Sequence, residues 1–269
     1  MAEQSHDPWQ SAMDHAVAVA RKAGEMVRAA LQVQDKCSPV QTKTSAVDLV
    51  TETDQEVERL IIQSVKSKFP SHSVVRRALC AHYCPTWIID PIDGTTNFVH
   101  GYPFVVCSSV QVEWGVVYSA IEDKMYTARR GRGAFCNGRP LQVSPQTGQR
   151  ESPYRCPTDS SLRKVLSLPV HGVRGAGSAA LNMCAVAAGF VEVYYETGIH
   201  VWDVAAASVI VTEAGGVLFD TTGEGAVDLM SRTIVAANNK PSPRESSSSW
   251  TFTKPFRLRL KYVRGEKTK

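Results

Sequence analysis

The chain has 269 residues, 43% of them hydrophobic, which suffices for one large layered core or two closely packed halves. Its formal net charge of +4 arises at one end. Residues 240–269 hold nine Lys or Arg against two Glu, a net of +7, so the other 239 residues carry −3. The body is therefore not basic, and we expect no nucleic-acid partner for it.

Cysteines and hydropathy both indicate a soluble cytoplasmic protein without membrane insertion. Seven scattered cysteines are an odd number and do not form a disulfide framework. Cys80 and Cys84 with His82 between them lack a fourth zinc ligand nearby. There is no apolar run of about 18 residues, and residues 1–7 are polar, unlike a targeting segment.

Apolar residues at spacings of three and four predict two amphipathic helices in the N-terminal part. The first begins at Asp7-Pro8, with an inward face of Trp9, Met13, Ala16, Val17, Ala20, Ala23, Val27 and Leu31. The second follows residues 43–54, with an inward face of Val57, Leu60, Ile61, Val65 and Phe69.

Strands and helices alternate along the rest of the body. We expect strands near 86–89, 115–121, 124–129, 191–195 and 217–220, helices near 178–188 and around Asp203, and a tight hairpin turn at Asn137-Gly138. This order predicts an α/β (α+β) protein of layered helices and sheets.

The stretch from Trp87 to Phe98 reads Trp-Ile-Ile-Asp-Pro-Ile-Asp-Gly-Thr-Thr-Asn-Phe, an apolar strand that ends in two carboxylates. Asp90 and Asp93, with Pro91 stiffening the bend between them, offer the oxygen ligands that Mg²⁺ prefers. The N–H groups of Gly94 and Thr95 follow, where a helix start would favour a phosphate. An Asp-Pro-x-Asp-Gly string is also an ordinary surface turn, and the string alone leaves that alternative open.

A second stretch, residues 198–216, places Asp203 at the start of an apolar helix that Gly215-Gly216 ends. An aspartate there is also a common helix cap. Together, the two stretches resemble the two signatures of the inositol monophosphatase family, lithium-sensitive Mg²⁺-dependent phosphatases. The resemblance implies an αβαβα sandwich of the inositol monophosphatase and fructose-1,6-bisphosphatase type, over a single domain at 1–239. It also implies a homodimer and hydrolysis of inositol monophosphate.

The same resemblance implies roles for individual residues. Metal ligands match Asp90, the Ile92 carbonyl, Asp93 and Asp203. Thr95 and Asp54 match the pair that orients and deprotonates the attacking water, and Gly94 and Thr95 match the phosphate contacts. Contacts to the polyol ring match Gly177, Ser178, Ala179, Glu196 and Asp203. By their residue types, Ser178 is equally a helix cap and Glu196 a solvated charge at a strand end.

Several segments depart from the family pattern. Residues 74–78 read Val-Val-Arg-Arg-Ala where the family has Phe-Ile-Gly-Glu-Glu, which puts Arg77 in place of a glutamate metal ligand. One such charge at about 4 Å is worth roughly 4 kcal/mol at an effective dielectric of 20. Alternatively, segment 74–84 takes another path with Arg77 toward solvent. Segment 145–168 shows no strand-and-helix pattern, 102–114 is short enough to trim a strand pair, and 240–269 forms a basic, Ser/Pro-rich flexible tail.

The sequence therefore supports three hypotheses about function. The first is an active Mg²⁺-dependent inositol monophosphatase. The second is a catalytically impaired member of the family that acts as a dimer partner, because the usual glutamate is replaced at Arg77. The third, nucleic-acid binding through the tail, depends on charge alone.

Overall fold

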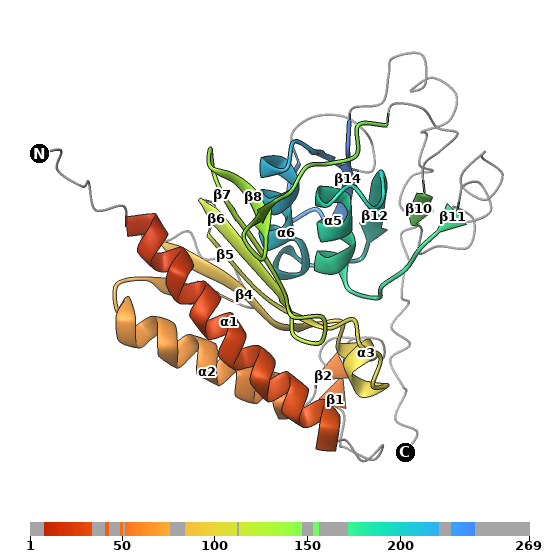
Figure 1. Cartoon of the computed structure of the whole chain (residues 1–269). Coiled ribbons are helices and arrows are strands. Elements are labelled where there is room, and N and C mark those ends of the chain that lie inside the picture. Colours follow the sequence, from red (N-terminus) through yellow and green to blue (C-terminus); the bar gives the residue numbers. More distant parts are fainter. Residues whose placement is uncertain are drawn as a thin grey trace, which may run out of the picture.

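The computed structural model describes residues 8–33, 41–42, 49–50, 52–75, 84–111, 113–146, 153–155, 172–220 and 227–239, and these form alternating layers (Figure 1). Helices α1 (Pro8–Val33) and α2 (Glu52–Lys68) cover one face of a seven-stranded sheet. Helix α6 (Val201–Glu213) covers the other face and packs beside α5 (Ala179–Ala187). A five-stranded sheet lies beyond these helices, which confirms the layered α/β fold.

The strands follow a simple order within each sheet. The larger sheet runs β3 (Ser73–Val75), β4 (Thr86–Asp93), β5 (Val106–Gln111), β6 (Trp114–Ser119), β7 (Lys124–Arg129), β8 (Gly133–Cys136) and β9 (Arg139–Pro140). The smaller sheet runs β11 (Gly172–Val173), β10 (Pro153–Arg155), β12 (Val193–Thr197), β14 (Thr233–Ala237) and β13 (Val217–Phe219). A short pair, β1 (Gln41–Thr42) and β2 (Leu49–Val50), and helix α3 (Thr95–Val99) complete the described elements.

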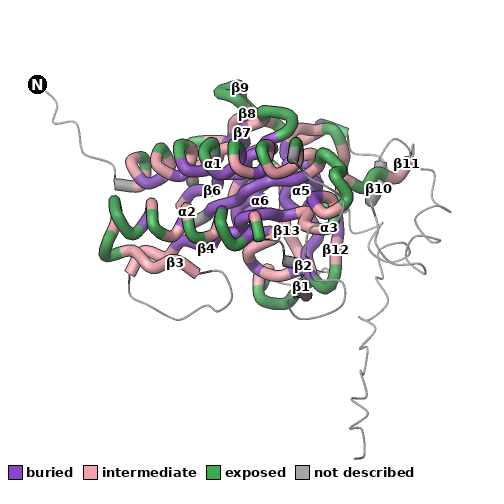
Figure 2. Tube along the Cα trace, turned by 90° about the horizontal axis from the view of Figure 1, so that it is seen from below, coloured by how far each residue is buried: buried purple, intermediate pink, exposed green. Residues whose placement is uncertain are grey.

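Both predicted helix faces are buried as expected. Figure 2 shows the inward sides of α1 and α2 against the sheet and their outer sides exposed. Ala16, Ala23 and Val27 of α1 pack with Val57 and Val65 of α2 and with the tryptophans of the sheet. On the opposite face, β6 touches α6 so closely that a Cβ on Gly115 would lie 2.4 Å from the Ala206 carbonyl oxygen.

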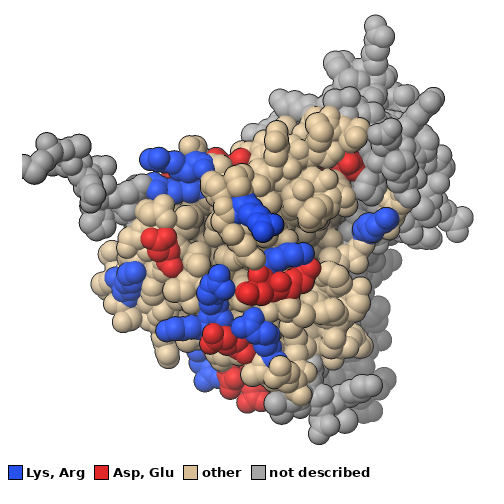
Figure 3. Space-filling view, viewed as in Figure 1, with Lys and Arg blue, Asp and Glu red and all other residues tan. Residues whose placement is uncertain are grey.

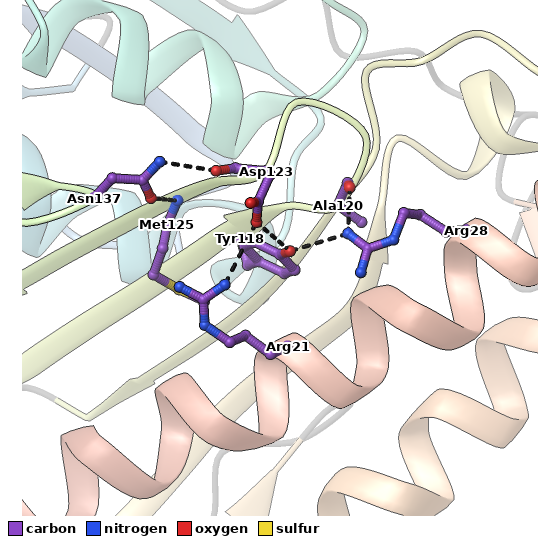
Figure 4. Close-up of polar contacts among 7 residues, drawn as sticks. All are labelled: Arg21, Arg28, Tyr118, Ala120, Asp123, Met125 and Asn137. Carbon is purple, nitrogen blue, oxygen red and sulfur yellow. Dashed lines mark hydrogen bonds and ion pairs between the residues drawn. The ribbon is translucent and has the colours of Figure 1, made fainter.

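Polar contacts tie α1 to the turn between β6 and β7 (Figure 4). Arg28 donates to the Tyr118 hydroxyl at 3.0 Å and to the Ala120 carbonyl at 2.7 Å. The Tyr118 hydroxyl donates in turn to Asp123 at 2.7 Å, and Arg21 pairs with the same carboxylate. Because Tyr118 is buried, these bonds satisfy a hydroxyl that would otherwise be costly to bury.

The structure describes strands in two of the unusual segments. Within 145–168 a strand is present, β10, which pairs in parallel with β11 and β12. It is three residues long, too short to give a periodic pattern. Within the short span 102–114 lies β5, which pairs with β6 over all six of its residues. Arg77, Cys80, His82 and the tail 240–269 lie outside the described residues.

Charge and hydropathy add two further observations. On the face drawn in Figure 3, Lys and Arg side chains lie among Asp and Glu side chains. No helix of the described ranges is both long and apolar enough to span a bilayer.

The described cysteines at 84, 107, 136 and 184 are free thiols.

An aromatic and imidazole cluster beneath β4 predicts that stability falls in mild acid. The Trp87 indole N–H donates to Nδ1 of His72 at 3.0 Å, so this nitrogen must be unprotonated. Burial lowers the pKa of His72 and also that of His15 below the ordinary value of 6.5. The unfolded chain therefore binds more protons, so stability is greatest above about pH 6.5 and falls as the pH drops through that value toward the folded pKa. We expect the urea midpoint to fall between about pH 7 and pH 5.

The variant His72→Gln isolates this effect, because glutamine accepts the Trp87 bond without titrating. Its urea midpoint should change less over the same pH range than that of the unsubstituted chain. Equal pH slopes for the two proteins would contradict the assignment to His72.

Candidate active site

A bulge in β4 creates the site. Between Asp90 and Asp93, strand β4 advances three residues while β5 advances two, from Ser108 to Val106. In a regular strand residues three apart face opposite sides, and one extra residue reverses this alternation. Ile92 therefore faces the α1–α2 layer with Ile89, while Asp90 and Asp93 both face α5 and α6. Pro91, which has no N–H to donate to the ladder, is compatible with this irregularity.

Three carboxylates share this region. Burial first, and then the charge of Asp90, raise the pKa of Asp93 to about 7. Burial first, and then the charges of Asp90 and Asp93, raise the pKa of Asp203 to about 9. The charged forms of Asp93 and Asp203 are therefore destabilised by burial beside like charges, and a bound cation would relieve that repulsion.

Helix α6 brings Asp203 to the other two. Asp203 lies in the first turn of α6, where its carboxylate accepts a bond from the His200 N–H at 2.7 Å. The His200 ring stacks on Trp202, with 4.3 Å between ring centroids. Arg232 donates to the Gly198 carbonyl at 2.6 Å and the Ile199 carbonyl at 3.2 Å, which holds the preceding turn. Asp203 is thus the third residue of α6, after the N-cap His200, and it binds the N-cap N–H while it faces the other carboxylates.

Gly215 and Gly216 end α6 as expected. Gly215 has a φ of +89°, and its N–H donates to the Thr212 carbonyl. The Gly216 N–H donates to the Val211 carbonyl, which completes the usual glycine-based helix terminus.

The structure also places Thr95 and Asp54 near the carboxylates. The Thr95 hydroxyl donates to the Ile92 carbonyl at 3.0 Å, so it borders one of the expected metal-ligating oxygens. Asp54 is fully buried in the first turn of α2. Burial, and then the charges of Asp90 and Asp54, raise the pKa of the Cys107 thiol on β5. A proton relay between Thr95 and Asp54 stays a prediction.

The residues expected to contact the ring lie beside Asp93. The Ser178 hydroxyl donates to Asp93 at 2.5 Å and accepts from the Leu181 N–H at 3.2 Å, so Ser178 both caps α5 and contacts the carboxylate group. The Ala180 N–H also donates to Asp93, at 2.8 Å. Glu196, partly buried on β12, accepts from the Tyr194 hydroxyl, and its charge helps to raise the pKa of Asp93. Gly177 and Ala179 flank Ser178.

The donor chemistry fits a hard divalent cation. Three carboxylates and the Ile92 carbonyl are oxygen ligands of the kind Mg²⁺ prefers. In the described part of the chain, no three His, Cys, Asp or Glu side chains already have the spacing of a formed metal site.

Sequence reasoning missed two residues that shape this site. The Asn97 amide donates to the carbonyls of Phe104 and Ala176. Asn97 directly follows the Gly-Thr-Thr turn of the motif, so its position in the sequence could have indicated a role in the site. Arg232 lies 29 residues after Asp203 and has a φ of +63°. No local pattern marks it.

Comparison with known proteins places the chain in a family. A family model described as "Inositol monophosphatase family" matches residues 9–250. "Inositol monophosphatase 1" of Bos taurus is 52% identical over 258 residues, which cover 87% of this chain and 92% of the relative. "Inositol monophosphatase 2" of Homo sapiens is 44% identical over 257 residues, which cover 87% of this chain and 88% of the relative. The solved structure of the Thermotoga maritima IMPase superposes with a TM-score of 0.77 at 32% identity, covering 85% of this chain and 92% of that one. The chain therefore belongs to the inositol monophosphatase family.

Proposed function

We propose that this protein hydrolyses inositol monophosphate to inositol and phosphate, and that Mg²⁺ binds at Asp90, the Ile92 carbonyl, Asp93 and Asp203. The observation that carries the proposal is the bulge in β4, which turns two buried aspartates toward a third. Relatives named as inositol monophosphatases support the substrate.

In this proposal, different groups of the site have different roles in ester hydrolysis. When bound, Mg²⁺ lowers the pKa of a water molecule and stabilises charge on the phosphate oxygens. Thr95 would orient the attacking water molecule and pass its proton toward Asp54, while the bond from phosphorus to the inositol oxygen breaks and that oxygen takes a proton from solvent. The N–H groups of Gly94 and Thr95 bind the phosphate, since they precede the first helical bond of α3, from the Phe98 N–H to the Gly94 carbonyl.

Three consecutive residues and two carboxylates orient the polyol in this proposal. Gly177, Ser178 and Ala179 line the site beside α3, where Gly177 meets the Asn97 amide, and Glu196 and Asp203 offer acceptors for ring hydroxyls. Because Ser178 and Asp93 share a hydrogen bond, the ring contacts are fixed relative to the carboxylates.

Phosphate release from inositol 1-phosphate tests this function directly. Purified full-length chain is assayed across a Mg²⁺ titration, with and without Li⁺. Mg²⁺-dependent release that Li⁺ inhibits supports the proposal. A folded sample that releases no phosphate at any Mg²⁺ concentration refutes it.

Arg77 favours a second candidate, a catalytically impaired family member that acts as a dimer partner. If Arg77 occupies the place of the family glutamate, the variant Arg77→Glu should raise Mg²⁺-dependent phosphate release at least about tenfold, because it replaces a repelling charge by an attracting one. The matched control is Arg76→Glu, which makes the same charge change one residue away. Equal effects of the two variants would show that position 77 has no special relation to the metal.

Assembly and location are also proposed. We infer a homodimer, because exposed Tyr102 and Phe190 line a groove of about 410 Å³ with Phe104 and Tyr194, and apolar rings of this kind are common in interfaces. Sedimentation of the full chain measures the assembly state. The cytoplasmic location, the single domain at 1–239 and the flexible tail at 240–269 stay predictions.

A further inference from the structure

One side-chain amide joins the two halves of the proposed site. The Asn97 Nδ2 group donates to the Phe104 carbonyl at 2.8 Å and to the Ala176 carbonyl at 2.7 Å. Asn97 belongs to α3, directly after the turn proposed to bind phosphate. Ala176 directly precedes Gly177 and Ser178, which are proposed to contact the polyol. Both amide protons are therefore donated to backbone carbonyls. The bond to Ala176 connects the phosphate side of the site, at Gly94 and Thr95, with the ring side, at Gly177 and Ser178.

The two turns are also in direct contact. A Cβ on Gly177 would lie 2.6 Å from both terminal atoms of the Asn97 amide, and Gly177 has a φ of +77°. A Cβ on Gly94 would lie 2.7 Å from the Phe104 carbonyl oxygen, and Gly94 has a φ of +85°. Glycine is thus required at both positions for conformation and for space, and the contact leaves the turns little freedom to slide.

Hydrogen bonds from α5 also hold the turn that contains Gly177 and Ser178. The buried Asn182 accepts from the Ala176 N–H at 3.2 Å and donates to the Ser178 carbonyl. Ala176 therefore has its N–H fixed by Asn182 on α5 and its carbonyl fixed by Asn97 on α3. Without Asn97, the ring-side turn would keep its attachment to α5 but lose its amide link to the phosphate side.

We propose that Asn97 is a positioning residue that sets the separation between the phosphate-binding turn and the ring-binding turn. This inference depends on the proposed function, since it assigns Asn97 a part in the same reaction. Asn97 acts through Ala176 and Phe104 rather than by touching the ester. It favours esters that fill both sides of the site over small esters that fill the phosphate side alone.

Two substrates and three variants test the inference. Asn97→Asp keeps the shape but turns a carboxylate oxygen toward two carbonyl oxygens, and Asn97→Ala removes the amide without adding repulsion. Thr96→Ala, on the exposed side of α3, is the control. Each protein is assayed on inositol 1-phosphate and on β-glycerophosphate, which carries no ring, and its thermal unfolding is recorded.

For both Asn97 variants we expect kcat/KM on inositol 1-phosphate to fall by about 100-fold, the cost of a displacement of roughly 1 Å. On β-glycerophosphate the fall should be less than about fivefold, since that ester does not need the ring-side turn. The Mg²⁺ concentration at half-maximal rate should not change. An equal loss on both esters would overturn the inference, because a general loss of structure affects both alike.

Failure of the proposed function has a different outcome. If the unsubstituted chain releases phosphate from neither ester, the proposed function is wrong, and calorimetric binding of inositol 1-phosphate and of inorganic phosphate then tests Asn97. Weaker binding of inositol 1-phosphate by Asn97→Ala, with unchanged phosphate binding, supports the inference. Parallel weakening of both, or no change in either, overturns it.

Discussion

The variant Asp90→Asn is expected to lower Mg²⁺-dependent phosphate release by roughly 1,000-fold. Asparagine preserves the shape of the side chain but removes one negative charge from the proposed metal site. One charge pair at about 4 Å is worth roughly 4 kcal/mol at an effective dielectric of 20, which corresponds to about three powers of ten in rate. Phosphate release from inositol 1-phosphate at saturating Mg²⁺ measures the effect.

Stability without Mg²⁺ separates this loss from unfolding. Asp90 raises the pKa of both Asp93 and Asp203 through like-charge repulsion, so its neutralisation should leave Tm unchanged or higher. The rise in Tm that added Mg²⁺ produces should disappear at the same time. Asp14→Asn, the same change on the exposed side of α1, is the control and should alter neither property by more than a small amount. Full activity in Asp90→Asn would show that the carboxylates do not hold the metal.

The variant Trp87→Ala should cost about 3–5 kcal/mol of stability, within a typical total of about 5–15 kcal/mol. Trp87 is fully buried and meets Trp114 edge to face, with ring centroids 4.8 Å apart. It also donates to His72. Removing the indole leaves a cavity between α2 and β4 and an imidazole without its donor. Urea unfolding at pH 7.5 measures the loss.

Trp87→Phe is the matched comparison, since it retains an aromatic ring and removes the N–H donor. It should cost clearly less than the alanine variant, and the difference measures packing rather than hydrogen bonding. Equal losses in the two variants would mean that the bond to His72, and not ring packing, supplies most of the stability at this position.

The elements that could be predicted from sequence are those with long, regular patterns. Helix α1 runs for 26 residues, and its inward face repeats often enough to be recognised. The turn at Asn137-Gly138 was also predictable, because both residues take the positive φ that a hairpin of this type requires. Strand β10 was not predictable, since three residues that pair with distant strands carry no periodic signal of their own.

The candidate site divides in the same way. Asp90 and Asp93 are close in sequence, so their motif by itself indicates a shared site. That Asp203 joins them depends on the packing of α6 against the sheet, and the resemblance to the family supplied it, not the local pattern. Asn97 and Arg232 act through backbone carbonyls on segments far away in the chain, and such partners are set by tertiary packing.

Because β4 carries a bulge between Asp90 and Asp93, the number of residues between these two aspartates matters more than the identity of those residues. Other apolar residues could replace Ile92 and keep the core filled, provided that the carbonyl stayed in place. Deletion of one residue between the two aspartates would instead restore regular pairing with β5, and the strand itself would gain hydrogen bonds. The same deletion would place the two aspartates two residues apart and keep both on one face, but the residue between them would lose its present position, and with it the carbonyl proposed as a metal ligand. Over evolutionary time, this segment can therefore tolerate substitution far better than any change in length.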